Sequence, residues 1–233
     1  MSYAIITGAT HGIGAAIALR LACEGFSLAI CARNGQELNA LKTRLEEAGS
    51  PLVVACTADM ALPEAVAGFA AAVLQQFPRV DILVNNVGIF EPGRLCDEPE
   101  GQLQRLMQVN VYSIYDLSRR IVPLMKQQQQ GHIFNICSVA SLKAYPNGGS
   151  YSITKYALLG FSDNLREELK GDHIRVTAIC PGATQSRSWS SSGIAPERLM
   201  PAGDVATMLW AAYSLSPQSD AELLVLRPQL GDL

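Results

Sequence analysis

The sequence has few charged residues and no long apolar run, and both absences narrow what the protein can be. Charged residues make up 17% of the 233 residues, and the formal net charge is −3. This net charge argues against a basic surface that binds nucleic acid. No run approaches the ~18 apolar residues that a membrane-spanning helix needs. We therefore expect neither a nucleic-acid partner nor a membrane partner.

Metal-binding and disulfide patterns are also missing. None of the six cysteines forms a C-x-x-C pair, and the three histidines show no metal-ligand spacing, so we expect no metal site. Four of the cysteines fall in or at the ends of apolar, strand-like runs, where buried free thiols are expected; these are Cys31, Cys56, Cys137 and Cys180. No signal peptide is expected before the first strand, and the cysteine usage favours a reducing cytoplasm.

What the chain does have is a regular alternation of strand-like and helical segments. Strands are expected at Tyr3–Thr7, Ser27–Ala32, Leu52–Thr57, Ile82–Asn85, His132–Cys137, Ile174–Cys180 and Leu223–Leu226. Helices are expected near 13–24, 36–48, 63–77, 100–127, 151–170 and 204–214. This rhythm predicts an α/β fold, with a doubly wound parallel sheet of about seven strands flanked by helices. No linker divides the chain, so residues 1–233 are expected to form one domain, with a flexible loop at Ser188–Gly193.

A glycine cluster follows the first strand directly. The run from Thr7 to Gly14 reads T-G-A-T-H-G-I-G and leads into a helical pattern. Glycine permits a tight turn and close approach of a ligand to the backbone, and the free N–H groups of a helix start attract phosphate. The spacing differs from the common G-x-G-x-x-G pattern, but its position between a strand and a helix predicts a dinucleotide site.

Three residues further along have the spacing of a proton-transfer site. Tyr151 and Lys155 are four positions apart, so a helix would present both on one face, and Ser138 ends an earlier strand. A free tyrosine has a pKa of roughly 10, and a neighbouring ammonium group makes its phenolate easier to form. A serine hydroxyl can hold the substrate oxygen that the phenol protonates. These groups predict proton exchange with a carbonyl or an alcohol.

Together these motifs resemble the compact short-chain dehydrogenase/reductase family. The resemblance rests on the glycine cluster, Ser138, Tyr151 and Lys155, with further matches at Asn85-Asn86-Val87-Gly88, Asn110 and Pro181-Gly182. Val87 stands where the family usually has alanine. The resemblance implies a Rossmann-type domain that uses a nicotinamide cofactor.

The family resemblance also implies roles for particular residues. Ser138, Tyr151, Lys155 and Asn110 would be catalytic, with Asn110 anchoring a water that relays protons to the lysine. Lys155 would also bind the nicotinamide ribose, Asp59 the adenine amine, and Ser186 or Thr184 the carboxamide. The full set of expected cofactor contacts is Gly8, Thr10, His11, Gly12, Ile13, Gly14, Arg33, Asp59, Asn86, Gly88, Tyr151, Lys155, Pro181, Gly182, Thr184 and Ser186.

The second strand indicates which cofactor is preferred. Sites for NAD place a carboxylate about 20 residues past the glycines, whereas this strand ends Ala32-Arg33-Asn34. Arg33 could clamp the 2′-phosphate of NADP(H), with His11 near the same phosphate. Alternatively, both are ordinary surface residues. We expect NADP(H).

The expected function is reduction of a small-molecule carbonyl, with a ketone, diketone or pterin side chain as the leading substrate classes. The tail from Leu223 and the segments around His132 and Ser138 are similar to bacterial sepiapterin reductases. A short lid from Ala183 to Met200 lacks a basic cluster, which disfavours an acidic carrier protein. The alternatives are a 3-oxoacyl-carrier-protein reductase and a non-catalytic NADP-sensing protein. An extended-family epimerase is rejected, because only about 50 residues follow Pro181.

Two helical segments predict self-association. Leu158, Leu159 and Phe161 cannot all face one sheet, and a helix that is apolar around most of its surface is normally buried. In the family, this helix and the one near 103–126 pair between subunits. We therefore expect a homodimer or a homotetramer.

Overall fold

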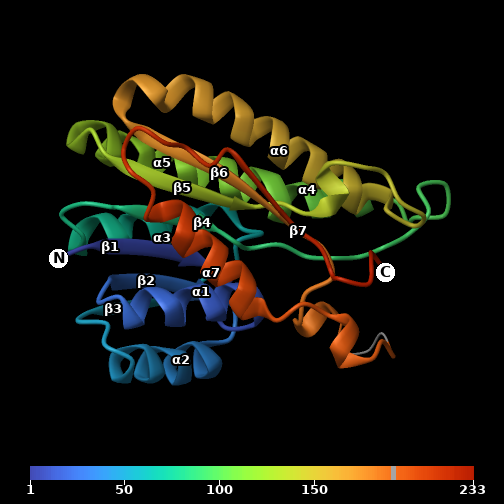
Figure 1. Ribbon diagram of the computed structural model, residues 1–233, viewed down its shortest axis with the longest axis horizontal. Helices are drawn as coiled ribbons and strands as arrows, with labels where there is room; N and C mark the ends of the chain where they lie inside the picture. The colour runs from blue at the N-terminus through green and yellow to red at the C-terminus, as the bar shows by residue number, and fades with distance from the viewer. Residues whose placement is uncertain (190–192) are drawn as a thin grey trace.

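The chain forms a single parallel sheet covered by helices on both faces, as Figure 1 shows for the computed structural model. The structure describes residues 1–189 and 193–233. Half of the predicted flexible loop at Ser188–Gly193, residues 190–192, therefore lies outside the described residues. The predicted α/β class and doubly wound sheet are confirmed.

Seven strands make up the sheet, in the order β3-β2-β1-β4-β5-β6-β7. Their bounds are β1 Tyr3–Thr7, β2 Ser27–Ala32, β3 Val53–Thr57, β4 Ile82–Asn85, β5 Gly131–Ile136, β6 Ile174–Pro181 and β7 Leu223–Leu226. Every pair of neighbouring strands is parallel. Each predicted strand is present, with ends that differ by one residue at most.

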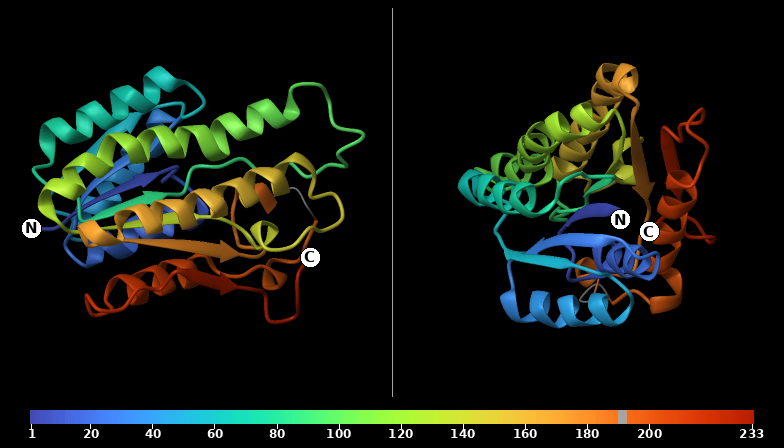
Figure 2. Two further views of the ribbon diagram at one scale, coloured as in Figure 1. Left: turned by 90° about the horizontal axis from the view of Figure 1, so that it is seen from above. Right: turned by 90° about the vertical axis from the view of Figure 1, so that its left-hand side faces the viewer.

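The helices form two layers (Figure 2). On one face, α1 (Gly12–Cys23) contacts α2 (Gly35–Glu47) and α7 (Ala202–Tyr213). On the other face, α3 (Pro63–Gln76) contacts α5 (Ser113–Gln128), while α4 (Gln102–Met107) contacts α6 (Gly149–Leu169). The described helices include none that is long and apolar enough to span a membrane.

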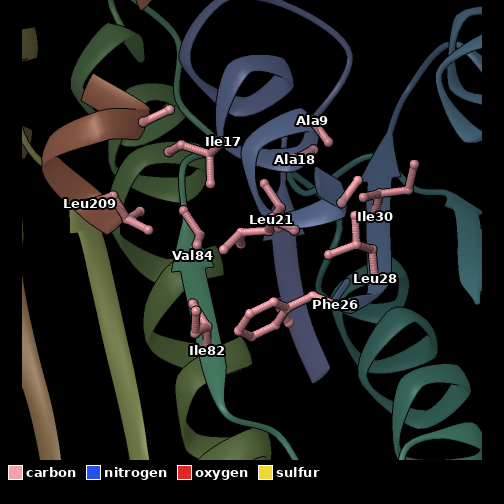
Figure 3. Close-up of a cluster of buried hydrophobic side chains, with 14 of the residues drawn as sticks. Ala9, Ile17, Ala18, Leu21, Phe26, Leu28, Ile30, Ile82, Val84 and Leu209 are labelled. Atoms are coloured by element: carbon pink, nitrogen blue, oxygen red, sulfur yellow. The ribbon is translucent and has the colours of Figure 1, made fainter. Parts of the chain in front are cut away.

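The hydrophobic core lies between the sheet and these layers. Figure 3 shows Ile17 and Leu21 of α1 among side chains of β2 and β4, with Leu209 of α7 closing one side. These side chains are fully buried. Burying a side chain of this size contributes about 1.5–3 kcal/mol. The core therefore fixes α1 against the sheet and so positions the loop that precedes it.

One element differs from its prediction. The helix expected over residues 100–127 is broken into α4, a π-helical turn at Gln108–Tyr112, and α5. Asn110 lies in this wider turn, and its side chain bonds both the N–H and the C=O of Ile89. These bonds lie outside the helix, so helical periodicity gave no sign of the turn. Such π-bulges occur often at functional sites.

Candidate functional site

A cleft of about 1030 Å³ opens at the carboxyl ends of the strands. The chain runs outward from β1 to β2 and β3 in one direction, and from β4 to β7 in the other. Ligands of open α/β sheets bind in the crevice at such a reversal point. All but two of the predicted site residues line this cleft; the exceptions are Gly14 and Asn110, which lie behind its wall.

The glycine loop forms one end of the cleft. Gly8 and Gly12 have positive φ values of 61° and 53°, a region that side chains disfavour. Gly14 serves another purpose, because a Cβ there would come within 2.5 Å of the Asn86 side-chain nitrogen. The loop therefore packs directly on the end of β4, and its backbone faces the cleft.

Asn86 connects the loop to β4. Its side-chain nitrogen donates to the carbonyl oxygens of Thr7 and Gly8, each at 2.9 Å, and its backbone N–H donates to Thr7 Oγ1 at 3.0 Å. The backbone N–H and the side-chain NH₂ group of Asn86 therefore donate to other atoms of the chain. Asn86 lines the cleft as expected, while its side chain serves mainly to hold the glycine loop in place.

The three residues of the predicted proton-transfer site converge at the other end of the cleft. Ser138 follows β5, and Tyr151 and Lys155 come from α6. The ammonium nitrogen of Lys155 lies 5.8 Å from the centroid of the Tyr151 ring and donates to the carbonyl oxygen of Ile136 at 2.8 Å. The backbone of β5 therefore fixes the lysine beside the phenol.

Burial controls the proton affinity of these groups. It raises the pKa of the Tyr151 phenol to about 12, and hydrogen bonding to Ser138 opposes this rise. Burial also lowers the pKa of Lys155, with the nearby thiols of Cys137 and Cys180 opposing. In the chain alone, Tyr151 therefore carries its proton at neutral pH. The phenol is in the form that can donate a proton to a substrate oxygen.

Asn110 lies behind the lysine and is fully buried. Its side-chain oxygen accepts from Ile89 N at 2.8 Å, and its nitrogen donates to Ile89 O at 3.0 Å and to Thr154 Oγ1 at 3.1 Å. A Cβ on Gly88 would lie 3.4 Å from Asn110 Oδ1 and 3.7 Å from Lys155 Nζ. Gly88 thus adjoins both polar groups and leaves the space between them free of a side chain.

The end of β2 carries a charged cluster that sequence reasoning only half identified. Arg33 is exposed, as expected for a residue that meets a ligand at the rim. His11, however, contacts the carboxylate of Glu37 at 2.8 Å, and Arg187 forms an ion pair with the same carboxylate. These contacts lower the pKa of Glu37, the His11 hydrogen bond most. Neither Glu37 nor Arg187 was predicted as a site residue.

The remaining predicted residues lie along the walls of the cleft. Asp59 accepts a hydrogen bond from Ala61 N at 3.0 Å in a local turn. Thr184 donates its hydroxyl to Gly182 O at 2.9 Å, whereas the Cβ of Ser186 would lie 3.0 Å from a Cβ on Gly12. Both Thr184 and Ser186 line the cleft.

Aromatic side chains surround the phenol. The ring of Phe90 meets that of Tyr151 edge-on at 4.8 Å and stacks with Trp189 at 5.6 Å. Tyr145 also lines the cleft. Phe90 was not among the predicted site residues. The run Gly88-Ile89-Phe90 after β4 carried no pattern that would place its ring against a helix 61 residues later in the sequence.

The cysteines match their predicted chemistry with one correction. All six are free, and Cys31, Cys137 and Cys180 are buried, but Cys56 is only half-buried. Cys56 lies on β3, which is an edge strand of the sheet and has a neighbouring strand on one side only. Among the described residues, no three histidine, cysteine or acidic side chains form a group that could hold a metal ion.

Comparison with known proteins identifies the family of the chain. The family model for short chain dehydrogenase matches residues 2–195. The sepiapterin reductase of Chlorobaculum tepidum is 30% identical, over 98% of this chain and 97% of its own length. Dehydrogenase/reductase SDR family member 7B of Bos taurus is 36% identical over 76% of this chain. The match covers only 56% of the bovine protein.

The solved structures include close matches to the fold. The alcohol dehydrogenase of the archaeon Thermococcus sibiricus, complexed with 5-hydroxy-NADP, superimposes with a TM-score of 0.91 and 28% identity. The superposition covers 100% of this chain and 99% of that one. With a family model that matches most of the sequence, and a cleft built from the same motifs, this chain belongs to the short-chain dehydrogenase/reductase family.

Proposed function

We propose that the protein reduces the carbonyl group of a small molecule to an alcohol, with NADPH as the hydride donor. The observation that carries the proposal is the convergence of Ser138, Tyr151 and Lys155 at one end of the cleft, with the glycine loop at the other. The bare backbone of that loop suits a pyrophosphate, and the exposed Arg33 suits a 2′-phosphate. A relative complexed with an NADP derivative supports the same cofactor.

The residues divide the chemistry between them. NADPH, when bound, supplies the hydride that reaches the carbonyl carbon. Tyr151 donates its phenolic proton to the carbonyl oxygen, and the Ser138 hydroxyl holds that oxygen in position. Lys155 stabilises the resulting phenolate through its positive charge and holds the nicotinamide ribose. Oxidation of an alcohol follows the same steps in reverse.

Asn110 completes the proposed proton path. Its side-chain oxygen has a second lone pair beyond the bond from Ile89, and the open space at Gly88 separates it from the lysine. A water in this space could return a proton to Lys155 after each turnover. The three hydrogen bonds of Asn110 keep the side chain in one orientation for that role.

The substrate is proposed to be small or planar. Aromatic rings line the cleft around the Tyr151 phenol, from Phe90, Trp189 and Tyr145. Such rings can stack against a compact carbonyl compound. A pterin side chain is the leading specific proposal, supported by the full-length similarity to a sepiapterin reductase. A 3-oxoacyl-carrier-protein is the alternative substrate, and the convergence of Ser138, Tyr151 and Lys155 disfavours a purely NADP-sensing role.

A panel of carbonyl compounds tests this substrate class. We expect NADPH to be consumed faster with a pterin ketone or a small diketone than with a 3-oxoacyl thioester on a carrier protein. Initial rates at equal substrate concentration, followed by NADPH absorbance, make the comparison. Equal or faster turnover of the carrier-bound thioester would overturn the proposed substrate class, and the lack of turnover with every compound would favour the sensing alternative.

We also propose that the chain forms a homodimer or a homotetramer through α5 and α6. Tyr115 of α5 and Ile153 and Tyr156 of α6 are exposed, and Tyr112 of the π turn adds a fourth large side chain. Exposed apolar groups gathered on neighbouring helices mark interaction surfaces. Leu158 of α6 is by contrast fully buried against the sheet.

Light scattering tests the assembly. We expect a mass of at least twice 25.0 kDa for the natural chain at micromolar concentration. The double substitution Tyr115→Glu and Tyr156→Glu should yield a folded monomer, because two buried charges would oppose the interface. The matched control, the double substitution Leu52→Glu and Leu62→Glu, places two charges on exposed leucines outside both helices and should leave the assembly intact. A natural chain that is monomeric would rule out this assembly.

A further inference from the structure

Glu37 has an unusual position for a helix-start glutamate. It is the third residue of α2, where a glutamate can bond back to the residue that caps the helix. Asn34 caps α2 by accepting from the N–H groups of Gln36 and Glu37. The carboxylate of Glu37 instead turns into the cleft, where one oxygen contacts His11 and the other contacts Arg187. Helix capping therefore does not explain this carboxylate.

The three residues come from three separate parts of the chain. His11 belongs to the glycine loop, Glu37 to α2, and Arg187 to the segment after β6. The contact between Arg187 and Glu37 spans 150 positions in the sequence. All three line the same end of the cleft as Arg33. The Glu37 carboxylate is thus held by His11 and Arg187, and the guanidinium group of Arg33 lines the same cleft.

This is the end where a ribose 2′-phosphate binds if the cofactor is NADPH, because an arginine just after the second strand accommodates that group. A 2′-phosphate needs the same kind of partners that Glu37 already has: cationic groups and N–H donors arranged around oxygen atoms. The carboxylate and the phosphate have the same sign of charge. They cannot share those partners without repelling each other.

We infer that Glu37 is a specificity-determining residue, an internal anion that competes with the 2′-phosphate of NADPH for His11 and Arg187. The inference rests on the proposed use of NADPH. It goes further by assigning a role to the Glu37 carboxylate. Arg33 favours a cofactor with a 2′-phosphate, and Glu37 limits that preference. The binding of NADPH then requires the carboxylate to release its partners, whereas the binding of NADH does not.

The test is direct binding of two cofactor fragments, adenosine 2′,5′-bisphosphate and adenosine 5′-monophosphate, measured by calorimetry on the full chain. Glu37→Gln keeps the size and the hydrogen-bonding ability of the side chain but removes its charge. We expect this substitution to tighten binding of the 2′,5′-bisphosphate roughly fivefold, because one repulsive charge leaves a partly solvated site. Binding of the 5′-monophosphate should change less than about twofold.

Glu46→Gln is the matched control. Glu46 lies on the same helix, pairs with Lys42 at 3.8 Å and is not part of the cleft. Its substitution removes the same charge from α2 and should leave both affinities unchanged. An equal effect of the two substitutions would mean that only the overall charge of the helix matters, which would overturn the inference.

A second variant shows whether Glu37 acts through its partners. In a His11→Asn background, Glu37→Gln should tighten the 2′,5′-bisphosphate less than it does in the natural chain, because one contested partner is gone. Unchanged or weaker binding of the bisphosphate in Glu37→Gln itself would overturn the inference. Two outcomes tell the proposals apart. If the natural chain prefers the bisphosphate and Glu37→Gln leaves that preference unchanged, only the inference about Glu37 fails; if the natural chain and Glu37→Gln both bind the two fragments equally, the proposed use of NADPH fails.

Discussion

Replacing Tyr151 with phenylalanine should lower the rate of carbonyl reduction by a factor of about 10³ or more. The substitution removes the phenolic proton and keeps the ring that packs against Phe90. General acid catalysis typically contributes ~10²–10⁴-fold, and Tyr151 is the phenol that forms a hydrogen bond with Ser138. Steady-state kinetics with the best substrate of the carbonyl panel measure the effect, and NADPH binding should stay nearly unchanged.

Tyr156→Phe provides the matched control. Tyr156 lies on the same helix, but it is exposed and not part of the cleft. Its loss of a hydroxyl should not affect turnover. If Tyr151→Phe kept a tenth of the natural activity, the phenol would not be the proton donor.

We expect the same residue to set the pH dependence of the proposed reaction. Burial raises the pKa of Tyr151 to about 12 in the chain alone, so the proton-bearing form dominates at neutral pH. Reduction uses that form, so its rate should fall as the pH rises through the pKa of the phenol. Oxidation of the alcohol uses the phenolate, so its rate should rise over the same range.

The second large effect concerns the cofactor. Arg33→Asp should raise the KM for NADPH about 100-fold, because it removes a charge-assisted contact and adds repulsion against the 2′-phosphate. The KM for NADH should change little or fall, since a carboxylate at this position can accept the 2′-hydroxyl. Initial rates with each cofactor at varied concentration give both values.

Arg44→Asp is the control for that experiment. Arg44 is an exposed residue of α2 that does not line the cleft, so its charge reversal should leave both KM values nearly unchanged. An unaltered ratio of NADPH to NADH in Arg33→Asp would identify Arg33 as an ordinary surface arginine.

The positions of the strands were predictable because a parallel sheet leaves a simple record in the sequence. β2 is buried at every position, and it reads as the continuous apolar run Leu28-Ala29-Ile30-Cys31-Ala32. The placement of Tyr151 and Lys155 on one face of α6 was predictable for a similar reason, since a separation of four positions brings two side chains together on any helix. Local pattern was sufficient in both cases.

The π turn at Gln108–Tyr112 was not predictable in this way. It forms where Asn110 bonds the backbone of Ile89 and the side chain of Thr154, which belong to other parts of the fold. A sequence pattern that indicates a helix does not record such bonds. The prediction of one continuous helix was therefore wrong in this turn alone.

The charged cluster was only partly predictable. His11 and Arg33 belong to motifs with known spacing, and both line the cleft as expected. Glu37 looks like an ordinary helix-start residue, and Arg187 lies in a segment without periodicity. Only the folded chain brings the two together, so the competition proposed for the 2′-phosphate site had no signal in the sequence.

Transfer of deuterium from labelled NADPH tests the central proposal most directly. With deuterium at the reactive C4 position of the nicotinamide and the best carbonyl of the panel as substrate, the alcohol product should carry one deuterium on the carbon that bore the carbonyl oxygen. The Tyr151→Phe variant should form the same labelled product far more slowly. An alcohol that carries no deuterium from either face of labelled NADPH, or cofactor consumption without alcohol, would contradict hydride transfer by this site.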